Sequence, residues 1–328
     1  MKERVLITGA SGFVGYHLIK EALDNNLEVF AAIRKSSKID HLKEFDIKYT
    51  YPDFGNLQAL KDDLIENKYD YIIHAAGITR ARSVAEYNQV NAENTYNLAL
   101  AASESNIGLK KFVLIGSLAA MGPLNTLDGI ITGDITPNPV TAYGKSKLLA
   151  EEKLRTIDGL NYTILRPTGV YGPRDRDIFI FFKQVSNHLE PYIGHIEQKL
   201  SLIYVTDLAK AAIKALYVGG KKAYNLSDGN YYSRYALGDF TREALKIKTV
   251  KFHLPVNFVK MIATIAEKVS SLNNKAAVLN VEKLNELMAV NWNCDITPAK
   301  TDLGFTPAYD LKAGVTETIK WYKANKWL

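Results

Sequence analysis

Cysteine and histidine are scarce in this chain of 328 residues. The one cysteine, Cys294, excludes a disulfide framework and any zinc or iron–sulfur site built from several thiolates. The six histidines form no close pair at the spacing of metal ligands, so we expect no metal centre. The single thiol and the lack of an export signal favour a cytoplasmic protein.

Long apolar runs and an excess of one charge are also missing. No segment reaches the roughly 20 apolar residues of a membrane-spanning helix, so we expect no membrane span. The 41 basic and 35 acidic residues give a net charge of +6, which suits an anionic small ligand but not nucleic acid. Hydrophobic residues make up 47% of the chain, which indicates a globular protein with a large core.

The strongest signal lies near the amino terminus. The apolar residues 5–7 predict a buried strand, and residues 16–23 carry apolar side chains at helical spacing. The connection contains three glycines that permit a tight turn, close approach of a pyrophosphate and close packing of helix on strand. A strand, a glycine-rich turn and a helix together favour a dinucleotide-binding loop. We therefore predict cofactor contacts by Gly9, Ser11, Gly12, Phe13, Val14 and Gly15.

The end of the second predicted strand, residues 29–33, bears on which dinucleotide is bound. NAD sites usually have an acidic residue here to bind the ribose 2′-hydroxyl, but this strand is followed by Arg34-Lys35-Ser36-Ser37. Two cations and two hydroxyls suit a 2′-phosphate. We therefore favour NADP, with Arg34 and Lys35 as ligands. NAD stays open, because Arg34 could instead stack on the adenine or face solvent.

Strands and helices alternate through the first two thirds of the chain. Further strands are predicted at residues 48–51, 71–74, 111–115 and 162–165, with helical segments such as 90–105 between them. This order predicts an α/β fold: a Rossmann-type doubly wound parallel sheet that binds its ligand at the carboxyl ends of the strands. We expect an NADP-binding domain of residues 1–171, with 201–227 returning to it. A smaller C-terminal substrate domain would comprise residues 172–200 and 228–328. The small residues Ala75, Ala76 and Gly77 at one strand end leave room for the cofactor.

Tyr143 and Lys147 form the candidate chemical centre. They are four residues apart, so on a helix they share one face. A tyrosine has an ordinary pKa of about 10. A nearby ammonium and an oxidised nicotinamide ring both favour the phenolate, so we expect a lowered pKa for Tyr143 and proton exchange with a substrate oxygen during hydride transfer. Because such pairs are common by chance, the hypothesis depends on the glycine-rich loop and the strand ends that precede them.

These motifs, in this order, resemble those of the extended short-chain dehydrogenase/reductase superfamily, the NAD-dependent epimerase/dehydratase family. It includes nucleotide-sugar epimerases, dihydroflavonol reductases and 3β-hydroxysteroid dehydrogenases. The likeness extends from the glycine-rich loop to Thr318-Ile319-Lys320-Trp321-Tyr322. It implies that Ser117 hydrogen-bonds the substrate oxygen beside Tyr143, that Lys147 also holds the nicotinamide ribose, and that a homodimer is possible. Further cofactor-site residues implied by the resemblance are Asp53, Phe54, Asn91, Pro167, Thr168, Gly169 and Val170.

Two departures from the nucleotide-sugar enzymes bear on the reaction. Gly169 and Leu200 stand where those enzymes usually carry an asparagine and an arginine that grip the diphosphate. Lys199, Arg174 or Arg176 could substitute. The dihydroflavonol reductase and 3β-hydroxysteroid dehydrogenase branch is therefore favoured.

The leading interpretation is an NADP(H)-dependent oxidoreductase that interconverts a carbonyl and an alcohol on a small-molecule substrate. The alternative is a nucleoside-diphosphate-sugar epimerase or dehydratase with tightly bound NAD. A non-catalytic NADP sensor is least favoured, because it has no need of an acid–base tyrosine.

One further segment, residues 256–269, carries apolar side chains at helical spacing. They are Val259, Ile262, Ala263, Ala266 and Val269. We expect a helix packed on the substrate domain, and keep a membrane-surface or partner-binding helix as the alternative.

Overall fold

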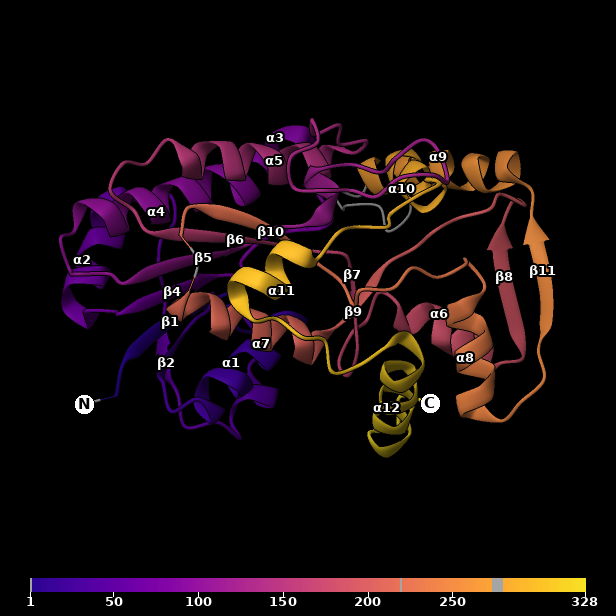
Figure 1. The fold of residues 1–328 in the computed structure, drawn as a ribbon, viewed down its shortest axis with the longest axis horizontal. Helices are drawn as coiled ribbons and strands as arrows, with labels where there is room; N and C mark the ends of the chain where they lie inside the picture. Colours follow the sequence, from indigo (N-terminus) through magenta and orange to yellow (C-terminus); the bar gives the residue numbers. More distant parts are fainter. Residues whose placement is uncertain (1, 219, 273–279) are drawn as a thin grey trace.

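A parallel sheet forms the centre of the computed structural model, which describes residues 2–218, 220–272 and 280–328. Its seven strands lie in the order β10-β6-β5-β4-β1-β2-β3, and all of their pairings are parallel (Figure 1). In chain order they are β1 (Arg4–Thr8), β2 (Glu28–Ala32), β3 (Lys48–Thr50), β4 (Tyr71–His74), β5 (Lys111–Ile115), β6 (Tyr162–Pro167) and β10 (Lys222–Leu226). The strand order reverses between β1 and β4, where a doubly wound sheet binds its ligand. The predicted Rossmann-type fold is therefore confirmed.

Helices cover both faces of this sheet, as the alternating side chains of each strand require. Val5 and Ile7 of β1 point into one core, and Leu6 points into the other. The helices of the first face are α1 (Phe13–Asp24), α7 (Val205–Tyr217) and α11 (Thr297–Leu303). Those of the second face are α2 (Leu57–Asn67), α4 (Asn94–Glu104) and α5 (Ala142–Arg155). Because both faces are buried, the strands are apolar runs without polar alternation.

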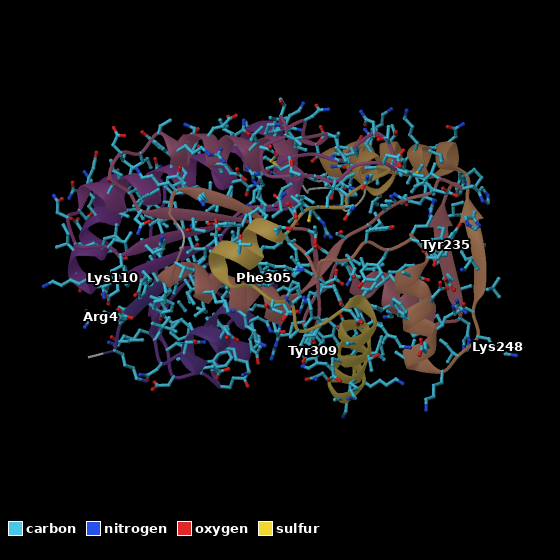
Figure 2. The ribbon with its side chains drawn as sticks, in the orientation of Figure 1. Arg4, Lys110, Tyr235, Lys248, Phe305 and Tyr309 are labelled. Carbon is cyan, nitrogen blue, oxygen red and sulfur yellow. The ribbon has the colours of Figure 1, made fainter. Side chains whose placement is uncertain are left out.

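Ion pairs connect the amino ends of neighbouring strands. The guanidinium of Arg4 pairs with Glu28 at 3.0 Å, and the ammonium of Lys110 pairs with Asp70 at 2.8 Å. Arg4 and Lys110 lie near the amino terminus, at the far end of the molecule from β8 and β11 (Figure 2). The carboxyl ends of the strands lie on the opposite side of the sheet, which faces the second half of the molecule.

The second half contains two small sheets and five helices, counted over the described residues. Its strands form two parallel pairs, β7 (Gly169–Tyr171) with β9 (Leu202–Tyr204), and β8 (Leu189–Ile193) with β11 (Val250–Leu254). Its helices are α6 (Phe179–Ser186), α8 (Ala236–Leu245), α9 (Val256–Leu272), α10 (Val281–Leu287) and α12 (Leu311–Ala324). The short α3 (Val84–Tyr87) lies on the sheet side, against α5.

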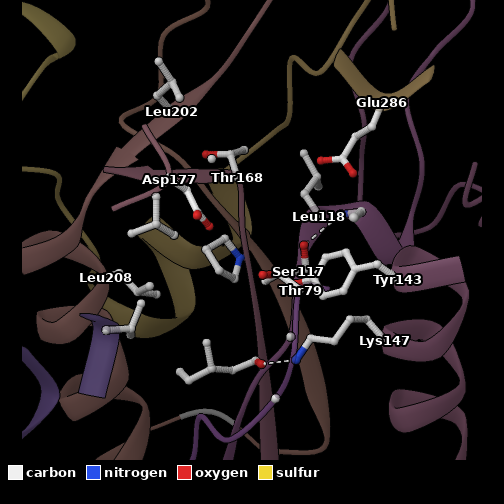
Figure 3. Close-up of a pocket in the computed structure, with 18 of the residues that line it drawn as sticks. Thr79, Ser117, Leu118, Tyr143, Lys147, Thr168, Asp177, Leu202, Leu208 and Glu286 are labelled. Atoms are coloured by element: carbon white, nitrogen blue, oxygen red, sulfur yellow. Dashed lines mark hydrogen bonds between the residues drawn. The ribbon is translucent and has the colours of Figure 1, made fainter. Parts of the chain in front are cut away.

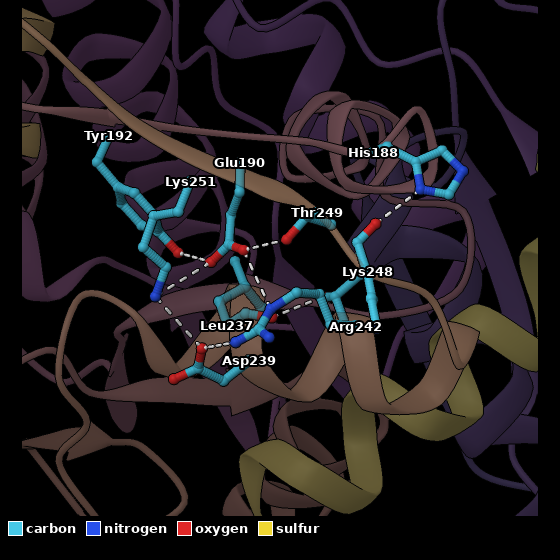
Figure 4. Close-up of polar contacts among 10 residues, drawn as sticks. His188, Glu190, Tyr192, Leu237, Asp239, Arg242, Lys248, Thr249 and Lys251 are labelled. Atoms are coloured by element: carbon cyan, nitrogen blue, oxygen red, sulfur yellow. Dashed lines mark hydrogen bonds and ion pairs between the residues drawn. The ribbon is translucent and has the colours of Figure 1, made fainter.

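A buried carboxylate joins β8, β11 and α8. Glu190 is fully buried and accepts hydrogen bonds from the hydroxyls of Tyr192 and Thr249, the latter at 2.7 Å (Figure 4). The Nε of Arg242 lies 3.1 Å from the same carboxylate. A buried charge needs such partners, so this cluster fixes the two-stranded sheet on α8.

The C-terminal segment crosses back to the main sheet. Cys294, Ile296 and Phe305 belong to the core that contains β1 and α1. Figure 2 shows Phe305 beside α11 and Tyr309 farther on, toward α12. The sequence prediction assigns these residues to the substrate domain. The proposed domain boundaries stay a prediction, but this segment packs in the core of the main sheet, whereas Phe182 and Leu311 belong to a separate core.

Helix α9 buries only part of its apolar surface. Val259 and Ala263 are buried, as expected, whereas Ile262 is exposed together with Phe258, Met261 and Ile265. The side chain of Val269 lies outside the described part of the chain. Within the described ranges, no helix is both long and apolar enough to cross a membrane.

Candidate active site

The glycine-rich loop between β1 and α1 lies against the end of β4. Gly9 has a φ of +68°, and a Cβ on it would lie 2.7 Å from the carbonyl carbon and oxygen of Ala75. A Cβ on Gly15 would lie 2.2 Å from the carbonyl oxygen of Gly9. These positions therefore need glycine for conformation and close approach, as the motif predicts.

The start of α1 is an open anion site. Gly12 is the N-cap residue and provides no capping side chain, and the first turn contains no acidic residue. Its backbone N–H groups and the positive end of the helix dipole are therefore available to a phosphate. The buried hydroxyl of Thr168 has no hydrogen-bond partner among the described residues, and Thr168 lines the same cavity as Phe13 and Val14 at the start of α1. These features fit a dinucleotide whose pyrophosphate lies on the loop.

Asn91 holds the loop after β4 to the helix of Tyr143. Its Oδ1 accepts from the N–H of Ile78 at 2.8 Å, and its Nδ2 donates to the carbonyl of Ile78 at 3.0 Å and to Ser146 Oγ at 2.9 Å. It lies in a π-helical stretch, Asn88–Glu93, where the sequence predicts the start of a regular helix. Asn91 is buried, so in this structure it positions the walls of the site.

A cavity of about 450 Å³ lies at the carboxyl ends of the strands. Ser117, Tyr143 and Lys147 all line it, and Figure 3 shows them on one side, with Leu202 and Leu208 opposite. Of the predicted cofactor residues, Phe13, Val14, Ala75, Gly77, Pro167, Thr168, Gly169 and Val170 also line this cavity.

The close approach of α5 to the end of β5 brings Tyr143 to Ser117. Thr141 caps α5 by accepting from the N–H of Gly144 at 3.0 Å. A Cβ on Gly144 would lie 2.4 Å from the carbonyl oxygen of Ala119. The glycine after Tyr143 therefore lets the first turn of the helix pack on the turn that follows Ser117.

The ammonium of Lys147 is buried and donates to the carbonyl oxygen of Ile115 at 2.8 Å. Burial lowers the pKa of Lys147 to about 8, and the carboxylate of Glu151, one turn further along α5, opposes this shift. Glu151 is itself paired with Arg166, with 2.6 Å between its Oε2 and the guanidinium Nη2. At pH 7 Lys147 is still mostly charged.

The pKa of Tyr143 differs from the sequence prediction. Burial raises it to about 12, and the neighbouring Ser117 hydroxyl lowers it by less than burial raises it. The expected lowering by an adjacent ammonium is wrong for this structure, because Lys147 points to the carbonyl of Ile115 and desolvation of the phenolate dominates. At neutral pH Tyr143 is a phenol, able to donate a proton.

The other predicted cofactor residues, Gly9, Ser11, Gly12, Gly15, Arg34, Lys35, Asp53, Phe54, Ala76 and Asn91, are not part of the cavity lining. Arg34 and Lys35 follow β2 with exposed side chains, and neither makes an ion pair with a described residue. The Oδ1 of Asp53 accepts from the N–H of Gly55 at 3.0 Å, and the ring of Phe54 lies 5.9 Å from that of His74. Ala76 also lies outside; its N–H donates to the hydroxyl of Thr8 at 3.0 Å.

Part of the cavity wall was not predicted. It contains the apolar residues Leu118, Leu200, Leu202, Leu208, Leu287 and Trp292 and the charged residues Asp175, Asp177, Lys283 and Glu286. Lys283 and Glu286 pair with each other at 2.7 Å. The sequence carries no spacing rule that would bring α10 to this wall, because its position depends on tertiary packing.

The fold and the cavity define a Rossmann-type NAD(P)-binding protein. The chain belongs to the NAD dependent epimerase/dehydratase family, whose model matches residues 5–227. It is an enzyme of the NAD(P)-dependent oxidoreductase/epimerase type. The match does not separate the epimerase branch from the reductase branch.

Similar proteins include both types of activity. The ceramide reductase of Caulobacter vibrioides is 26% identical over 99% of this chain and 96% of its own length. The UDP-glucose 4-epimerase of Vibrio cholerae is also 26% identical, over 98% of this chain and 95% of its own. The WbmG enzyme of Bordetella bronchiseptica, solved with NAD and UDP, has a TM-score of 0.79 at 19% identity, and the match covers 99% of this chain and 96% of that one.

Proposed function

We propose that this protein is an NADP(H)-dependent oxidoreductase that reduces the carbonyl group of a small-molecule substrate to an alcohol. The observation that carries the proposal is the convergence of Ser117, Tyr143 and Lys147 on one wall of a cavity, with Leu202, Leu208 and Asp177 on the other side (Figure 3). A carbonyl carbon placed against that wall would lie beside a hydroxyl donor, a neutral phenol and the expected nicotinamide site.

The cofactor, when bound, supplies a hydride to the carbonyl carbon. Tyr143 donates its phenolic proton to the carbonyl oxygen, so the product is an alcohol. Ser117 donates a hydrogen bond to the same oxygen and orients it. Lys147 uses one N–H on Ile115, and its remaining N–H groups hold the nicotinamide ribose. The raised pKa of Tyr143 suits reduction, because this direction requires the protonated phenol at the start.

NADP is favoured over NAD by the groups after β2. Arg34 and Lys35 are exposed and available, and an anion with two charges at the 2′ position would pair with them. The N–H of Arg34 donates to Ser37 Oγ at 3.1 Å, which holds the loop in a compact turn. We infer that this turn binds the 2′-phosphate.

An epimerase acting on a nucleoside-diphosphate sugar is the second candidate, since similar proteins carry that activity. Its diphosphate needs cations, and the described cations on the cavity wall are Lys147 and Lys283, of which Lys283 is paired with Glu286. The possible substitutes lie elsewhere. Lys199 lies over the ring of Tyr231, and Arg174 stacks on Tyr16 at 3.9 Å.

Two measurements test the proposal. The first identifies, by mass, any nucleotide released when the purified protein is denatured. An epimerase regenerates its cofactor in each cycle and can keep it bound, so near-stoichiometric NAD would favour the epimerase. The second measures turnover of a panel of ketones and aldehydes with NADPH and with NADH. We expect turnover with NADPH, and its absence across the panel would refute the reductase and leave the epimerase and the sensor as the alternatives.

The Tyr143→Phe variant tests the assigned proton donor. Phe keeps the ring but lacks the hydroxyl, so we expect turnover to be lost and NADPH binding to be kept. Tyr217→Phe is the matched control, because Tyr217 is an exposed tyrosine outside the cavity and its variant should keep full activity. Full activity of Tyr143→Phe would refute the role.

A further inference from the structure

Helix α9 carries an exposed apolar stripe that the fold leaves uncovered. The stripe consists of Phe258, Met261, Ile262 and Ile265, which are 46%, 52%, 41% and 53% exposed. Their spacing of three and four residues places them on one face of the helix. Val259 and Ala263, on another face, are buried against the protein. The helix therefore has one apolar face for the core and a second one for something outside.

The exposed charges on α9 are basic. Lys260 and Lys268 are exposed, and neither pairs with an acidic group among the described residues. The one acidic side chain of the helix, Glu267, is partly buried and accepts a hydrogen bond from the N–H of Val281 at 2.9 Å. Lys268 lies next to the stripe, three residues after Ile265, and Lys260 lies on the opposite, polar side of the helix. An apolar stripe on a helix whose exposed charges are lysines is complementary to an anionic lipid surface.

The stripe is connected to the cavity through α10. The contact between Glu267 and Val281 joins α9 to the start of α10, and Figure 1 shows the two helices side by side. Leu287, at the end of α10, is 48% exposed and also lines the cavity. A bilayer or protein that bound to α9 would therefore lie near the part of the cavity wall that Leu287 of α10 forms.

We propose that α9 is a membrane-surface helix, which inserts the stripe into the boundary between the headgroups and the acyl chains of an anionic bilayer. This adds a location to the proposed function and does not depend on it. If the proposed function also holds, the leucines in the cavity lining and the nearby bilayer indicate a carbonyl substrate with an apolar chain that is drawn from the membrane.

A second copy of this chain is a weaker candidate for the occupant. If a fully exposed large side chain presents about 200 Å², the stripe offers roughly 400 Å². A stable dimer buries about 800 Å² on each partner. Insertion into a bilayer has no such minimum, because the surrounding lipid adapts to a narrow stripe.

The test is sedimentation of the full-length protein with vesicles of phosphatidylcholine, with and without phosphatidylglycerol. We expect binding that is stronger to the anionic vesicles. The double variant Met261→Ser/Ile265→Ser should weaken the partition coefficient by about tenfold per residue, because each change removes one large apolar side chain from the lipid. Lys260→Gln/Lys268→Gln should weaken binding to the anionic vesicles by about fivefold per lysine and leave binding to phosphatidylcholine unchanged.

A matched control uses exposed apolar residues elsewhere. Ile65→Ser/Val84→Ser changes side chains that are 50% and 57% exposed on α2 and α3, and it should bind vesicles as the wild type does. All changed positions are exposed, so folding should be preserved, which circular dichroism checks. Wild-type protein that binds neither vesicle, or a Met261→Ser/Ile265→Ser variant that binds as well as wild type, would overturn the proposal. So would a wild-type dimer that this variant dissociates, since the occupant would then be a second copy.

Turnover of a short, water-soluble ketone with NADPH separates this proposal from the proposed function. Vesicle binding without turnover, either of this ketone or of any member of the ketone and aldehyde panel, would refute the reductase and support the membrane helix. Turnover without vesicle binding would refute only the membrane helix. If both hold, Met261→Ser/Ile265→Ser should keep kcat/KM on the soluble ketone.

Discussion

Replacing Gly9 with alanine should lower the free energy of unfolding for two reasons: its backbone conformation and its close approach to β4. The φ of +68° at Gly9 disfavours any residue with a Cβ by about 1–2 kcal/mol. In addition, the new Cβ would lie 2.7 Å from the backbone of Ala75, which cannot move without shifting the end of β4. Overpacking of this kind costs about 1–3 kcal/mol more. We therefore expect Gly9→Ala to lower the free energy of unfolding by about 2–5 kcal/mol.

Gly159→Ala provides the matched control. Gly159 has a φ of +72°, but a Cβ there would meet nothing within 4 Å. The control should therefore lower the free energy of unfolding only by the conformational cost of about 1–2 kcal/mol. Replacing glycine by alanine also reduces the chain entropy of the unfolded state, and this effect is the same for both variants.

The assay combines urea unfolding with NADPH titration. Displacement of the loop should weaken NADPH binding in Gly9→Ala and leave it unchanged in Gly159→Ala. Equal stability of the two variants, together with wild-type NADPH affinity of Gly9→Ala, would refute the argument from close approach.

Three further predictions follow from buried polar groups. Burial lowers the pKa of His17 to about 4, so the unfolded chain takes up a proton that the folded chain does not. Stability from this group is complete above about pH 6.5 and falls by about 1.4 kcal/mol per pH unit below it. In urea unfolding across this range, His17→Gln should reduce the slope; an unchanged slope would contradict this assignment. Glu190→Gln should lower the free energy of unfolding by about 2–3 kcal/mol in the same assay, whereas Glu317→Gln, in an exposed pair, should change it by less than about 1 kcal/mol. Asn91→Ala should lower kcat/KM by about tenfold to a hundredfold with little change in NADPH affinity, since it loosens the wall beside Tyr143; an unchanged kcat/KM would contradict that role.

The sheet could be predicted from the sequence because its strands are buried on both faces. Each predicted strand of the central sheet appears within two residues of its expected bounds, and the glycine-rich loop lies where the spacing places it. The strands outside that sheet gave weaker signals. Glu190 interrupts the apolar pattern of β8, and its buried carboxylate is bound by Tyr192, by Thr249 and by Arg242 of α8.

Proximity in the site could be predicted better than electrostatics. The spacing of Tyr143 and Lys147 is a local property of one helix, and the approach to Ser117 follows from a strand end that the sequence marks. The pKa of Tyr143 is set by burial, and the direction of the Lys147 ammonium is set by a carbonyl from β5. Neither is visible in a linear pattern. The exposed face of α9 was also hidden, since apolar spacing does not tell which of two faces meets the core.

The return of residues 294–305 to the main core affects how the chain folds during synthesis. The strands of the nucleotide-binding sheet are synthesised first. The packing of one face of that sheet is completed only by Ile296, Leu303 and Phe305. Until they emerge, the nascent chain exposes an apolar patch on a sheet that is otherwise assembled. We therefore expect the nucleotide-binding half to need the last tenth of translation, and a fragment that ends at residue 227 to bind chaperones or aggregate.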